Sequence, residues 1–439
     1  MAPGKDENRW RGLIEDCFRR EAGFQIPMPD SEQDLIETGV LDSMGWVSFL
    51  RSLESASGLN ELGAQLTAET PSFESILHAL RESKAETQSP GAGASHPQLV
   101  ETRIPVLIAS SSVALGSRRI PSVEIDRAFG MTEGKLQHRA GIESLTYASE
   151  NENELSLGTR AARKALHAAA CGVQELDWII ATSETHLSYP SLAAQLHSQL
   201  LTRETCGALD VGGACLGLLN GLAVAQSLIA SSRARTILVV TADVHSRVFI
   251  PGRVAGELGG LFGDGASAFL LRTSGGNASQ NAYSLGEFFF GCAGQYAGAI
   301  RVAQAANGDL DTHFDGEALS RAAITRLEKV IRETELRSGI ALSSVNGVAT
   351  HQPNPRLLKL LANQLGLPLK RFPKVAETSG NLGSSTCGVA LHSVLQTAQD
   401  APAGDCGPIF LASLGPGLLF GGGWLTPCHH LPRYEGRDL

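Results

Sequence analysis

Hydrophobic residues in the long C-terminal part of the chain alternate between short continuous runs and segments with helical spacing. The continuous runs predict strands at Val106–Ala109, Trp178–Thr182, Thr236–Thr241, Ala268–Arg272, Gly347–Thr350 and Ile409–Ser413. Between them, apolar residues three to four positions apart predict helices over Leu155–Ala170, Ser191–Leu201 and Glu317–Thr334. Strands that alternate with helices are typical of an α/β fold, in which helices pack on a sheet.

The front of the chain has helical spacing throughout. One face of a first helix carries Trp10, Leu13, Ile14, Cys17 and Phe18, and one face of a later helix carries Phe73, Ile76, Leu77 and Leu80. A third apolar segment, Leu35 to Glu54, lies between these two. Three short amphipathic helices predict a small all-α bundle.

Composition divides the chain in the same way. Residues 1–85 hold 8 Lys and Arg against 15 Asp and Glu, a net charge of −7, and the whole chain carries −9. Residues 86–102 are rich in Pro, Gly, Ala and Ser and show no apolar period, as is typical of a flexible linker. We therefore predict one domain at 1–85 and a second at 103–439. The acidic first domain favours docking onto a basic protein surface and argues against nucleic acid as a partner.

The eight cysteines are spread singly, without a CxxC pair or the spacing of metal ligands. This pattern indicates neither a disulfide framework nor a metal site. The N-terminus has no apolar signal segment, and polar residues interrupt the longest apolar stretch, around Cys215. We expect a reduced, cytoplasmic protein that does not enter a membrane.

Cys215 lies in ALDVGGACLGLLNGLAVAQSLIA (208–230), where a short apolar run passes through two glycines into a helical segment. At the start of such a helix, free N–H groups and the positive end of the helix dipole surround the sulfur. They lower the pKa of the thiol and stabilise an oxyanion on a bound acyl group. Cys215 is therefore the predicted nucleophile. A cysteine that only packs in the core is the simpler alternative.

Two residues farther along occupy similar positions. His351 follows a strand-like run in GVATHQPNPRLL (347–358), and Asn381 lies in a glycine turn before an apolar helix in TSGNLGSSTCGVAL (378–391). Proteins with α/β folds place their chemistry at such strand and helix ends. Taken singly, the histidine fits a surface or core position and the asparagine an ordinary turn. Together with Cys215 they predict a reaction site.

Six segments of the C-terminal part resemble, in order and spacing, the ketoacyl synthase III group of thiolase-like condensing enzymes. They are RAGIES (139–144), YPSLAAQ (189–195), GGACLG (212–217), LFGDGASA (261–268), HQPNPR (351–356) and GNLGSS (380–385). The resemblance implies a five-layer α/β thiolase-like domain with an internal duplication, which forms a homodimer. It also implies Claisen condensation of acyl thioesters of CoA or acyl carrier protein. In this chemistry Cys215 carries the acyl group, and His351 and Asn381 donate hydrogen bonds to the enolate.

The segment LIETGVLDSMGWVSFLRSLE (35–54) resembles the modification site of acyl carrier proteins. In that family the serine of the DS-(Leu/Met) triplet receives 4′-phosphopantetheine. The resemblance thus implies this cofactor on Ser43 and a phosphopantetheinyl transferase as a partner. An ordinary helix N-terminus capped by Asp or Ser is the alternative. The two resemblances together predict a carrier domain fused to a condensing enzyme, in polyketide or other secondary-metabolite biosynthesis.

The chain departs from the synthase family at SLGPGLLFGGG (413–423). In ketoacyl synthase III, a glycine loop at this place supplies the second N–H of the oxyanion hole. If Pro416 stands at the donor position, that N–H is missing. Two alternatives then follow from the sequence: Gly417 donates instead, or the acyl pocket is reshaped.

Several other residues are candidates for supporting roles. Arg356 matches a basic family position that helps to dock the acyl carrier. Glu184 and His186 follow a predicted strand and are candidates for lining the pocket, and Glu257 is a candidate for an additional base. The segment Gly263 to Gly265 is expected to form a structural turn.

Three other functions fit parts of the sequence. An acyltransferase on the same scaffold would use His351 to deprotonate an alcohol or amine, without loss of CO2. Asn381 argues against it, because an enolate needs two donors and ester transfer does not. A papain-like hydrolase also has Cys, His and Asn in this order, but the chain lacks the CGxCW context of that family, and Ser43 would stay unexplained. A catalytically silent scaffold is disfavoured by the complete set of three residues.

Overall fold

The computed structural model describes residues 5–22, 28–36, 40–41, 43–57, 72–86, 104–273, 282–304, 310–400 and 406–428. Apart from Glu86, the predicted linker lies outside these residues. The chain divides into two compact units, one of residues 1–101 with 315–326 and one of residues 102–314 with 327–439. Within the described part of the chain, no helix is long and apolar enough to cross a membrane.

In its described part, the first unit contains the helices α1 (Lys5–Ala22), α2 (Ser43–Ser57) and α4 (Phe73–Glu86). Their apolar faces meet in one core, where the rings of Phe18, Phe49 and Phe73 contact one another with centroids 5.2 to 6.2 Å apart. The residues predicted to share a face on the first and last helices are buried in this core, except Leu13, which is partly buried. Aromatic burial of this kind stabilises a small bundle.

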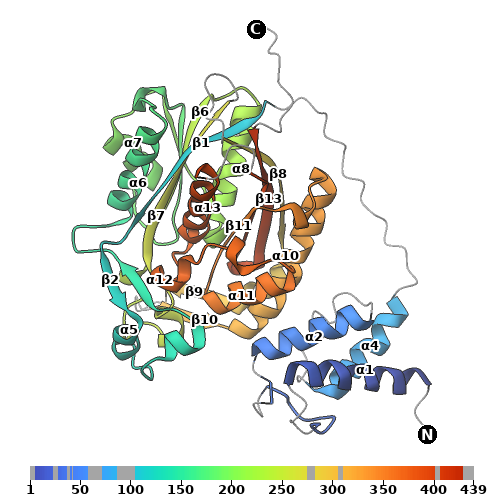
Figure 1. Ribbon diagram of the computed structural model, residues 1–439. Helices are drawn as coiled ribbons and strands as arrows, with labels where there is room; N and C mark the ends of the chain where they lie inside the picture. The colour runs from blue at the N-terminus through green and yellow to red at the C-terminus, as the bar shows by residue number, and fades with distance from the viewer. Residues whose placement is uncertain are drawn as a thin grey trace. The chain divides into compact units, whose positions relative to one another are not determined.

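Within the described residues, the second unit is built on a nine-stranded mixed sheet in the order β11-β12-β13-β8-β1-β7-β6-β4-β5 (Figure 1). The strands are β1 (Val106–Leu115), β4 (Trp178–Thr182), β5 (Gly207–Asp210), β6 (Thr236–Val244), β7 (Asp264–Thr273), β8 (Tyr283–Cys292), β11 (Gly347–Thr350), β12 (Ile409–Gly415) and β13 (Leu419–Pro427). Two further pairs form small sheets, β2 (Arg118–Pro121) with β3 (Ser144–Tyr147) and β9 (Ile300–Gln304) with β10 (Leu310–Phe314). All six predicted strands are present, four of them as parts of longer strands.

The sheet repeats one pattern twice. The strands β4, β6, β7 and β1 are neighbours in this order, with one parallel pair followed by two antiparallel pairs. The strands β11, β12, β13 and β8 repeat both the order and the directions. Helices α8 (Gly217–Ala230) and α13 (Ser384–Gln399) precede the corresponding strands β6 and β12. The topology therefore shows an internal duplication, and the two halves join where β1 pairs with β8.

Helices cover the two faces of each half. In β6, Ile237 and Val239 belong to a core cluster with α8 and α13, whereas Leu238 and Val240 pack with α6 (Glu154–Ala168) and α7 (Leu192–Leu200). Successive side chains of a strand point to opposite faces, so these helix pairs lie on opposite sides of the first half. The helix α13 also contacts strands of the second half. On that half, the part of α10 (Gly316–Ser338) from Leu327 onward belongs to this unit, and its Val330 lies close to Gly422 of β13.

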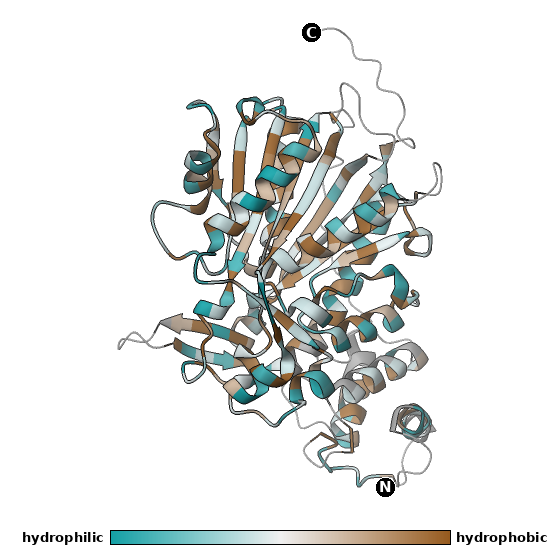
Figure 2. Cartoon of the chain, turned by 60° about the vertical axis from the view of Figure 1, so that its left-hand side comes forward, coloured by the Kyte–Doolittle hydropathy of each residue, from teal (hydrophilic) through white to brown (hydrophobic). Residues whose placement is uncertain are grey.

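Burial explains why the strongest strand signals were continuous apolar runs. All nine residues of β6 are buried, because helices cover both of its faces. Figure 2 shows hydrophobic positions concentrated along the strands, with hydrophilic positions on the outer helices.

Two glycine-rich segments behave differently from what their sequences indicate. The segment LFGGGWLTP forms β13, although glycine is depleted in strands. A Cβ at Gly422 would lie 2.7 Å from the carbonyl oxygen of Leu411 and 2.6 Å from Val330, so neighbouring elements approach this backbone closely. The expected turn at Gly263 to Gly265 is wrong, because Asp264 and Gly265 already begin β7.

Candidate active site

Cys215 lies in a short 3₁₀ turn, Ala214–Leu216, between β5 and α8. The strand-to-helix position that the sequence predicts is therefore correct. The two preceding residues have left-handed backbones, with φ 129° at Gly213 and φ 48° at Ala214. A Cβ at Gly213 would lie 2.3 Å from Nδ2 of Asn220, so only glycine fits there. This tight bend carries the chain directly from the sheet edge into α8 with Cys215 at the corner.

The end of β12 holds this corner in place. The Ser413 hydroxyl donates a 2.7 Å hydrogen bond to the carbonyl oxygen of Cys215. A Cβ at Gly415 would lie 3.6 Å from the backbone nitrogen of Cys215 and 3.1 Å from the carbonyl oxygen of Gly213. Gly415 thus allows the end of β12 to pass close to the backbone at Cys215, whose N–H stays the predicted first donor of an oxyanion hole. Gly417 follows Pro416 with φ 79°, and its role as the second donor stays a prediction.

The thiol of Cys215 does not have the low pKa expected from the helix end. Its residue is only 7% exposed, and burial raises the pKa of the thiol well above its ordinary value. The nearby Glu184 carboxylate, which interacts with the thiol as a hydrogen-bond partner, and the charge of Asp243 raise this pKa further. The helix dipole and the Cys215 N–H are weaker than these effects, because a thiolate in a buried site next to carboxylates is costly.

His351 directly follows β11, and its backbone N–H donates to the carbonyl oxygen of Ala412 at 3.3 Å. Burial lowers the pKa of the imidazole to about 4, and Glu184 opposes this shift only in part. Its Nδ1 is buried and makes no hydrogen bond to any described residue. His351 is therefore neutral at pH 7, and a neutral imidazole can donate one hydrogen bond to a substrate oxygen without acting as a strong acid.

Asn381 precedes α13 and is fixed by hydrogen bonds at both its backbone and its side chain. Its N–H donates to the Leu261 carbonyl at 2.8 Å, and its own carbonyl accepts from the Gly263 N–H at 2.9 Å. Its Oδ1 accepts from the Gly383 N–H at 3.0 Å and from the Thr386 hydroxyl at 3.1 Å. These two donors identify the oxygen end of the amide, so Nδ2 is the end that can donate to a substrate.

A group of ionisable residues adjoins these three. Glu184 follows β4, Asp243 lies near the end of β6, and His245 follows β6. Glu184 was predicted from the sequence to line the pocket, whereas Asp243 and His245 were not predicted. The signal was present in TILVVTADVH, where two ionisable residues end an otherwise apolar strand. Ionisable side chains are rarely buried unless they have partners, so their presence in such a strand indicates a site.

The remaining candidates lie elsewhere or stay open. The Glu257 side chain is 71% exposed and pairs with Lys135, which contradicts a role as a buried base. His186 lies in a surface loop, where its Nε2 contacts the carbonyl oxygen of Pro190 at 3.3 Å. Exposed Arg356 begins α11 (Pro355–Gln364), and its docking role stays a prediction. Ser43 is the first residue of α2, and its side chain lies outside the described part of the chain.

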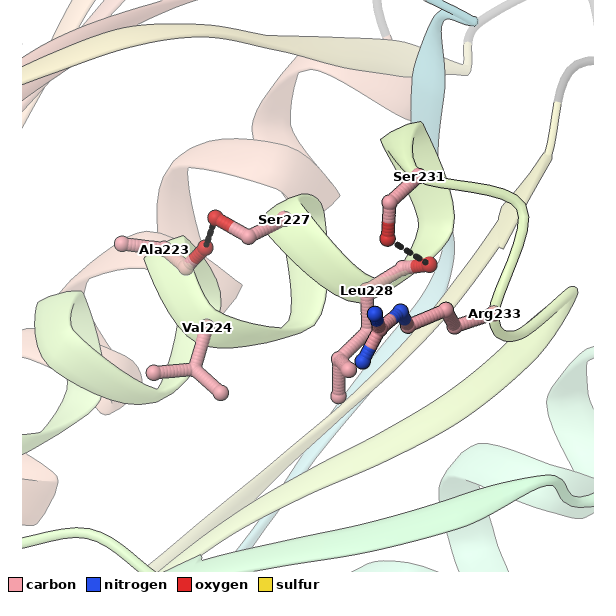
Figure 3. Close-up of a pocket in the computed structure, with 6 residues that line it drawn as sticks. All are labelled: Ala223, Val224, Ser227, Leu228, Ser231 and Arg233. Carbon is pink, nitrogen blue, oxygen red and sulfur yellow. Dashed lines mark hydrogen bonds between the residues drawn. The ribbon is translucent and has the colours of Figure 1, made fainter.

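A groove of about 530 Å³ runs along the C-terminal half of α8 (Figure 3). It is lined by Ala223, Val224, Ser227, Leu228, Ser231 and Arg233. The Ser227 and Ser231 hydroxyls donate to the carbonyl oxygens of Ala223 and Leu228. None of these residues is a Cys, His, Asp or Glu, and the predicted nucleophile Cys215 lies before the opposite end of α8. No group of three or more His, Cys, Asp and Glu among the described residues is arranged to hold a metal ion.

Comparison with known families supports this placement. Residues 209–294 match the family model of 3-oxoacyl-[acyl-carrier-protein] synthase III, and residues 336–426 match that of its C-terminal part. The first match contains Cys215, and the second contains His351 and Asn381. The second unit (residues 102–314 with 327–439) is thus similar to ketoacyl synthase III in both of its halves, and we call it the synthase unit after this similarity. The synthase unit of this chain is 29% identical over 328 residues to β-ketoacyl-[acyl-carrier-protein] synthase III of Ruegeria sp. TM1040, covering 73% of this chain and 98% of the relative.

Solved structures agree with this assignment. The synthase unit resembles 3-oxoacyl-[acyl-carrier-protein] synthase III of Aquifex aeolicus VF5, with a TM-score of 0.64 and 25% identity over 73% of this chain and 99% of the other. It shares its fold with the priming β-ketosynthase of the R1128 polyketide pathway, with a TM-score of 0.66 and 23% identity over 76% and 99% of the two chains. The thiolase-like α/β fold predicted for the synthase unit is therefore confirmed.

Proposed function

We propose that the synthase unit joins two acyl groups by Claisen condensation through an acyl thioester on Cys215. The observation that carries this proposal is the pair of neutral donors. His351 is neutral at pH 7, and hydrogen bonds to Oδ1 leave Nδ2 of Asn381 for the substrate. An enolate needs such donors, because a charged acid would protonate its carbanion.

The reaction has two stages on this site. Cys215 first attacks the carbonyl carbon of an acyl thioester, and the thiol of CoA or of a carrier leaves. A malonyl-type thioester then loses CO2, and its enolate oxygen accepts hydrogen bonds from His351 and Asn381. The enolate carbon attacks the acyl carbon on Cys215, which forms the new carbon–carbon bond and frees the cysteine.

Mass spectrometry tests the first stage. After incubation with a short acyl-CoA, we expect an acyl adduct on Cys215 and none in Cys215→Ala, because alanine has no sulfur to carry the acyl group. Cys428→Ala is the matched control, since Cys428 is a half-buried free thiol that follows the C-terminal end of β13. An adduct that persists in Cys215→Ala would refute the assignment.

The acyltransferase alternative is separated from condensation by its products. With a malonyl-type thioester, condensation releases CO2 and gives a β-keto product. Transfer of the acyl group to an alcohol or amine without CO2 would show that the scaffold works as an acyltransferase instead.

We further propose that the first unit is an acyl carrier domain with 4′-phosphopantetheine on Ser43. Two features support this. Ser43 begins α2, whose first turn holds no acidic residue, and a helix N-terminus favours a phosphate group. The predominance of acidic over basic residues in residues 1–85 suits docking onto basic surfaces. Once bound, the cofactor would supply a thiol that carries an acyl group as a thioester.

Treatment with CoA and a phosphopantetheinyl transferase tests the carrier proposal. The full-length chain should gain the mass of one phosphopantetheine group, and Ser43→Ala should gain none. Ser57→Ala, at the other end of α2, is the control that should be modified normally. If Ser43→Ala is modified to the same extent, the modification site lies elsewhere.

A carrier fused to a synthase, with a fold shared with a polyketide priming ketosynthase, supports a place in polyketide or other secondary-metabolite biosynthesis. We also propose a homodimer. The strand β5 is an edge of the described sheet, and its Leu209 is 38% exposed, which suits pairing with a second copy. Light scattering after gel filtration would measure the molar mass that decides this.

A further inference from the structure

The Claisen mechanism leaves one cluster at the site without a function. Glu184 and Asp243 both raise the pKa of the Cys215 thiol, and His245 pairs with Glu184, although an enolate needs only His351 and Asn381. Placing several ionisable groups in one buried site is costly unless they are paired. Their arrangement therefore calls for a role in the reaction.

Hydrogen bonds fix the position of each member. Oδ1 of Asp243 accepts from the Glu184 backbone N–H at 2.6 Å, and its Oδ2 accepts from the Ser384 hydroxyl at 2.6 Å. The His245 Nδ1 lies 3.2 Å from the Gly263 carbonyl oxygen, to which it donates. This leaves the His245 Nε2 to face Oε2 of Glu184 at 3.5 Å, the separation of an ion pair.

The other carboxylate oxygen of Glu184, Oε1, is available to accept a proton. This oxygen is buried and makes no hydrogen bond to any described residue, and the carboxylate is close enough to Cys215 to raise the pKa of the thiol. A buried acceptor without a donor costs free energy unless a proton or a donor reaches it during function. The side chain as a whole is 16% exposed, so it lies at the edge of the site and is not sealed in the core.

The protein keeps His245 charged in this place. Burial alone would lower the pKa of the imidazole, but Glu184, Asp243 and Asp264 outweigh it and raise this pKa to about 9. The rings of Phe262 and Phe249 lie against His245 with centroid distances of 4.6 and 5.7 Å. The cation and the carboxylate therefore face each other in a site shielded from water, where their attraction is strong.

We propose that Glu184 is the base that removes the proton from the Cys215 thiol, with His245 as its positioning cation; this step rests on the proposed acylation of Cys215. The S–H bond of Cys215 breaks as its proton passes to Oε1 of Glu184, and the sulfur attacks the acyl carbonyl. When the tetrahedral intermediate collapses, the bond to the leaving thiolate breaks. That thiolate takes the proton back from Glu184.

Charge explains why the proton should go to Glu184 and not to solvent. A Cys215 thiolate beside a Glu184 carboxylate would place two negative charges together, and this repulsion raises the pKa of the thiol. If the proton moves between the two residues, the pair always carries one negative charge, which the His245 imidazolium balances. The nucleophile can then form without the pH reaching the raised pKa of the thiol.

The rate of Cys215 acylation by a short acyl-CoA, measured by quenched mass spectrometry across pH, tests this proposal. At pH 7, Glu184→Gln should be slower by about 10²- to 10³-fold. Its rate should climb as the pH rises, because hydroxide then replaces the missing base. The control Glu257→Gln removes an exposed carboxylate and should keep the rate and the pH profile of the unaltered chain.

Titratable groups that face Glu184 and His245 could also change the pH dependence of acylation. They are Cys215 before α8, Asp243 and His245 at the end of β6, His351 after β11, and Asp264, which acts on His245. Because Gln cannot replace the carboxylate charge, Glu184→Asp is the second variant. It should fold, act more slowly, and keep the pH profile of the unaltered chain.

Each outcome bears on one proposal. A Glu184→Gln variant that is acylated at the normal rate, or that is slowed equally at every pH, would overturn the role of Glu184 as the base. If Glu184→Gln loses its thermal unfolding transition, a Glu184→Asp variant whose acylation needs alkaline pH would overturn it equally. If the unaltered chain never carries an acyl group on Cys215, the proposed function itself fails.

Discussion

The two halves of the synthase unit share one strand order but bring different chemistry to the site. The first half carries Glu184, Asp243 and His245 at the ends of β4 and β6, and Cys215 before α8. In the second half the matching places hold His351 after β11 and Asn381 before α13. The first half therefore holds the charged groups of the site and the second half the neutral ones. In the mechanism that we propose, the charged half moves a proton and the neutral half stabilises an enolate.

Removal of the donors of the neutral half should have the largest effect. His351→Ala and Asn381→Ala should each slow malonyl-type decarboxylation about 10²- to 10³-fold, because each removes a donor to the same enolate. The double variant should be little slower than either single variant, since both residues stabilise one transition state. Release of CO2 measures the rate.

Acylation of Cys215 in the same variants is the control for this prediction, because it depends on the charged half. It should stay within a few-fold of normal. An Asn381→Ala variant with full CO2 release would remove the distinction between the two halves.

The contact between the halves at Gly383 should be the next most sensitive place. Gly383 has φ 57°, and a Cβ there would lie 2.5 Å from Cε1 of His245 and 3.0 Å from the Glu184 carboxyl group. We expect Gly383→Ala to lower the free energy of unfolding by about 2–4 kcal/mol, because backbone strain and a steric clash add. Urea denaturation measures this value.

Gly366→Ala is the matched control. Gly366 has a similar φ of 63°, but no atom lies within 4 Å of its added Cβ. Gly366→Ala should lower the free energy of unfolding only through backbone strain, by about 1–2 kcal/mol. Equal losses of unfolding free energy in the two variants would show that Gly383 is needed only for its backbone conformation and not to avoid a clash with His245 and Glu184.

The pKa values of His351 and His245 should be shifted in opposite directions from the ordinary value of a histidine. The pKa of His351 is lowered to about 4 by burial, so the unfolded chain binds more protons as the pH falls. Stability from the neutral His351 is full above about pH 6.5 and is lost as the pH falls toward about 4. The pKa of His245 is raised to about 9, so its stability is full below about pH 6.5 and is lost as the pH rises through 9.

Nuclear magnetic resonance of the imidazole Cε1–H groups measures both titrations. His351→Gln and His245→Gln assign the signals. Two histidines that both titrate near the ordinary value would contradict the division into a neutral and a charged half.

The smallest effect is expected at the surface. Arg356→Ala should raise KM for a carrier-borne substrate about two- to five-fold and leave kcat with a CoA thioester unchanged, because an exposed cation contributes little beyond docking. Added salt should reduce the difference between the variant and the unaltered chain. If KM rises equally for both substrates, Arg356 acts on the site and not on the carrier.

Much of the fold could be predicted because its signals are local. The strands at 178–182 and 347–350 were predicted residue for residue, since helices bury both faces and leave continuous apolar runs. The positions of Cys215, His351 and Asn381 at the ends of strands and helices could also be predicted, because apolar runs and glycine turns next to them in the sequence mark those ends. The strand β13 was missed, because its glycines are explained only by close neighbours such as Val330.

What the sequence could not show are effects that arise from several elements meeting. The low pKa expected for Cys215 was wrong because the helix end is local, whereas Glu184 and Asp243 reach the sulfur from two other strands. In the same way, Glu257 looked like a possible base, but only the structure shows its side chain on the surface beside Lys135.

Asn381 belongs to the second half, yet its backbone is held by Leu261 and Gly263 of the first. This has a consequence for how such a chain can evolve. After the duplication, a half that replaces either copy would have to keep this contact, because the position of the amide depends on both halves. Recombination between related genes should therefore tolerate breakpoints outside the paired halves and select against breakpoints that part residues 261–263 from residue 381.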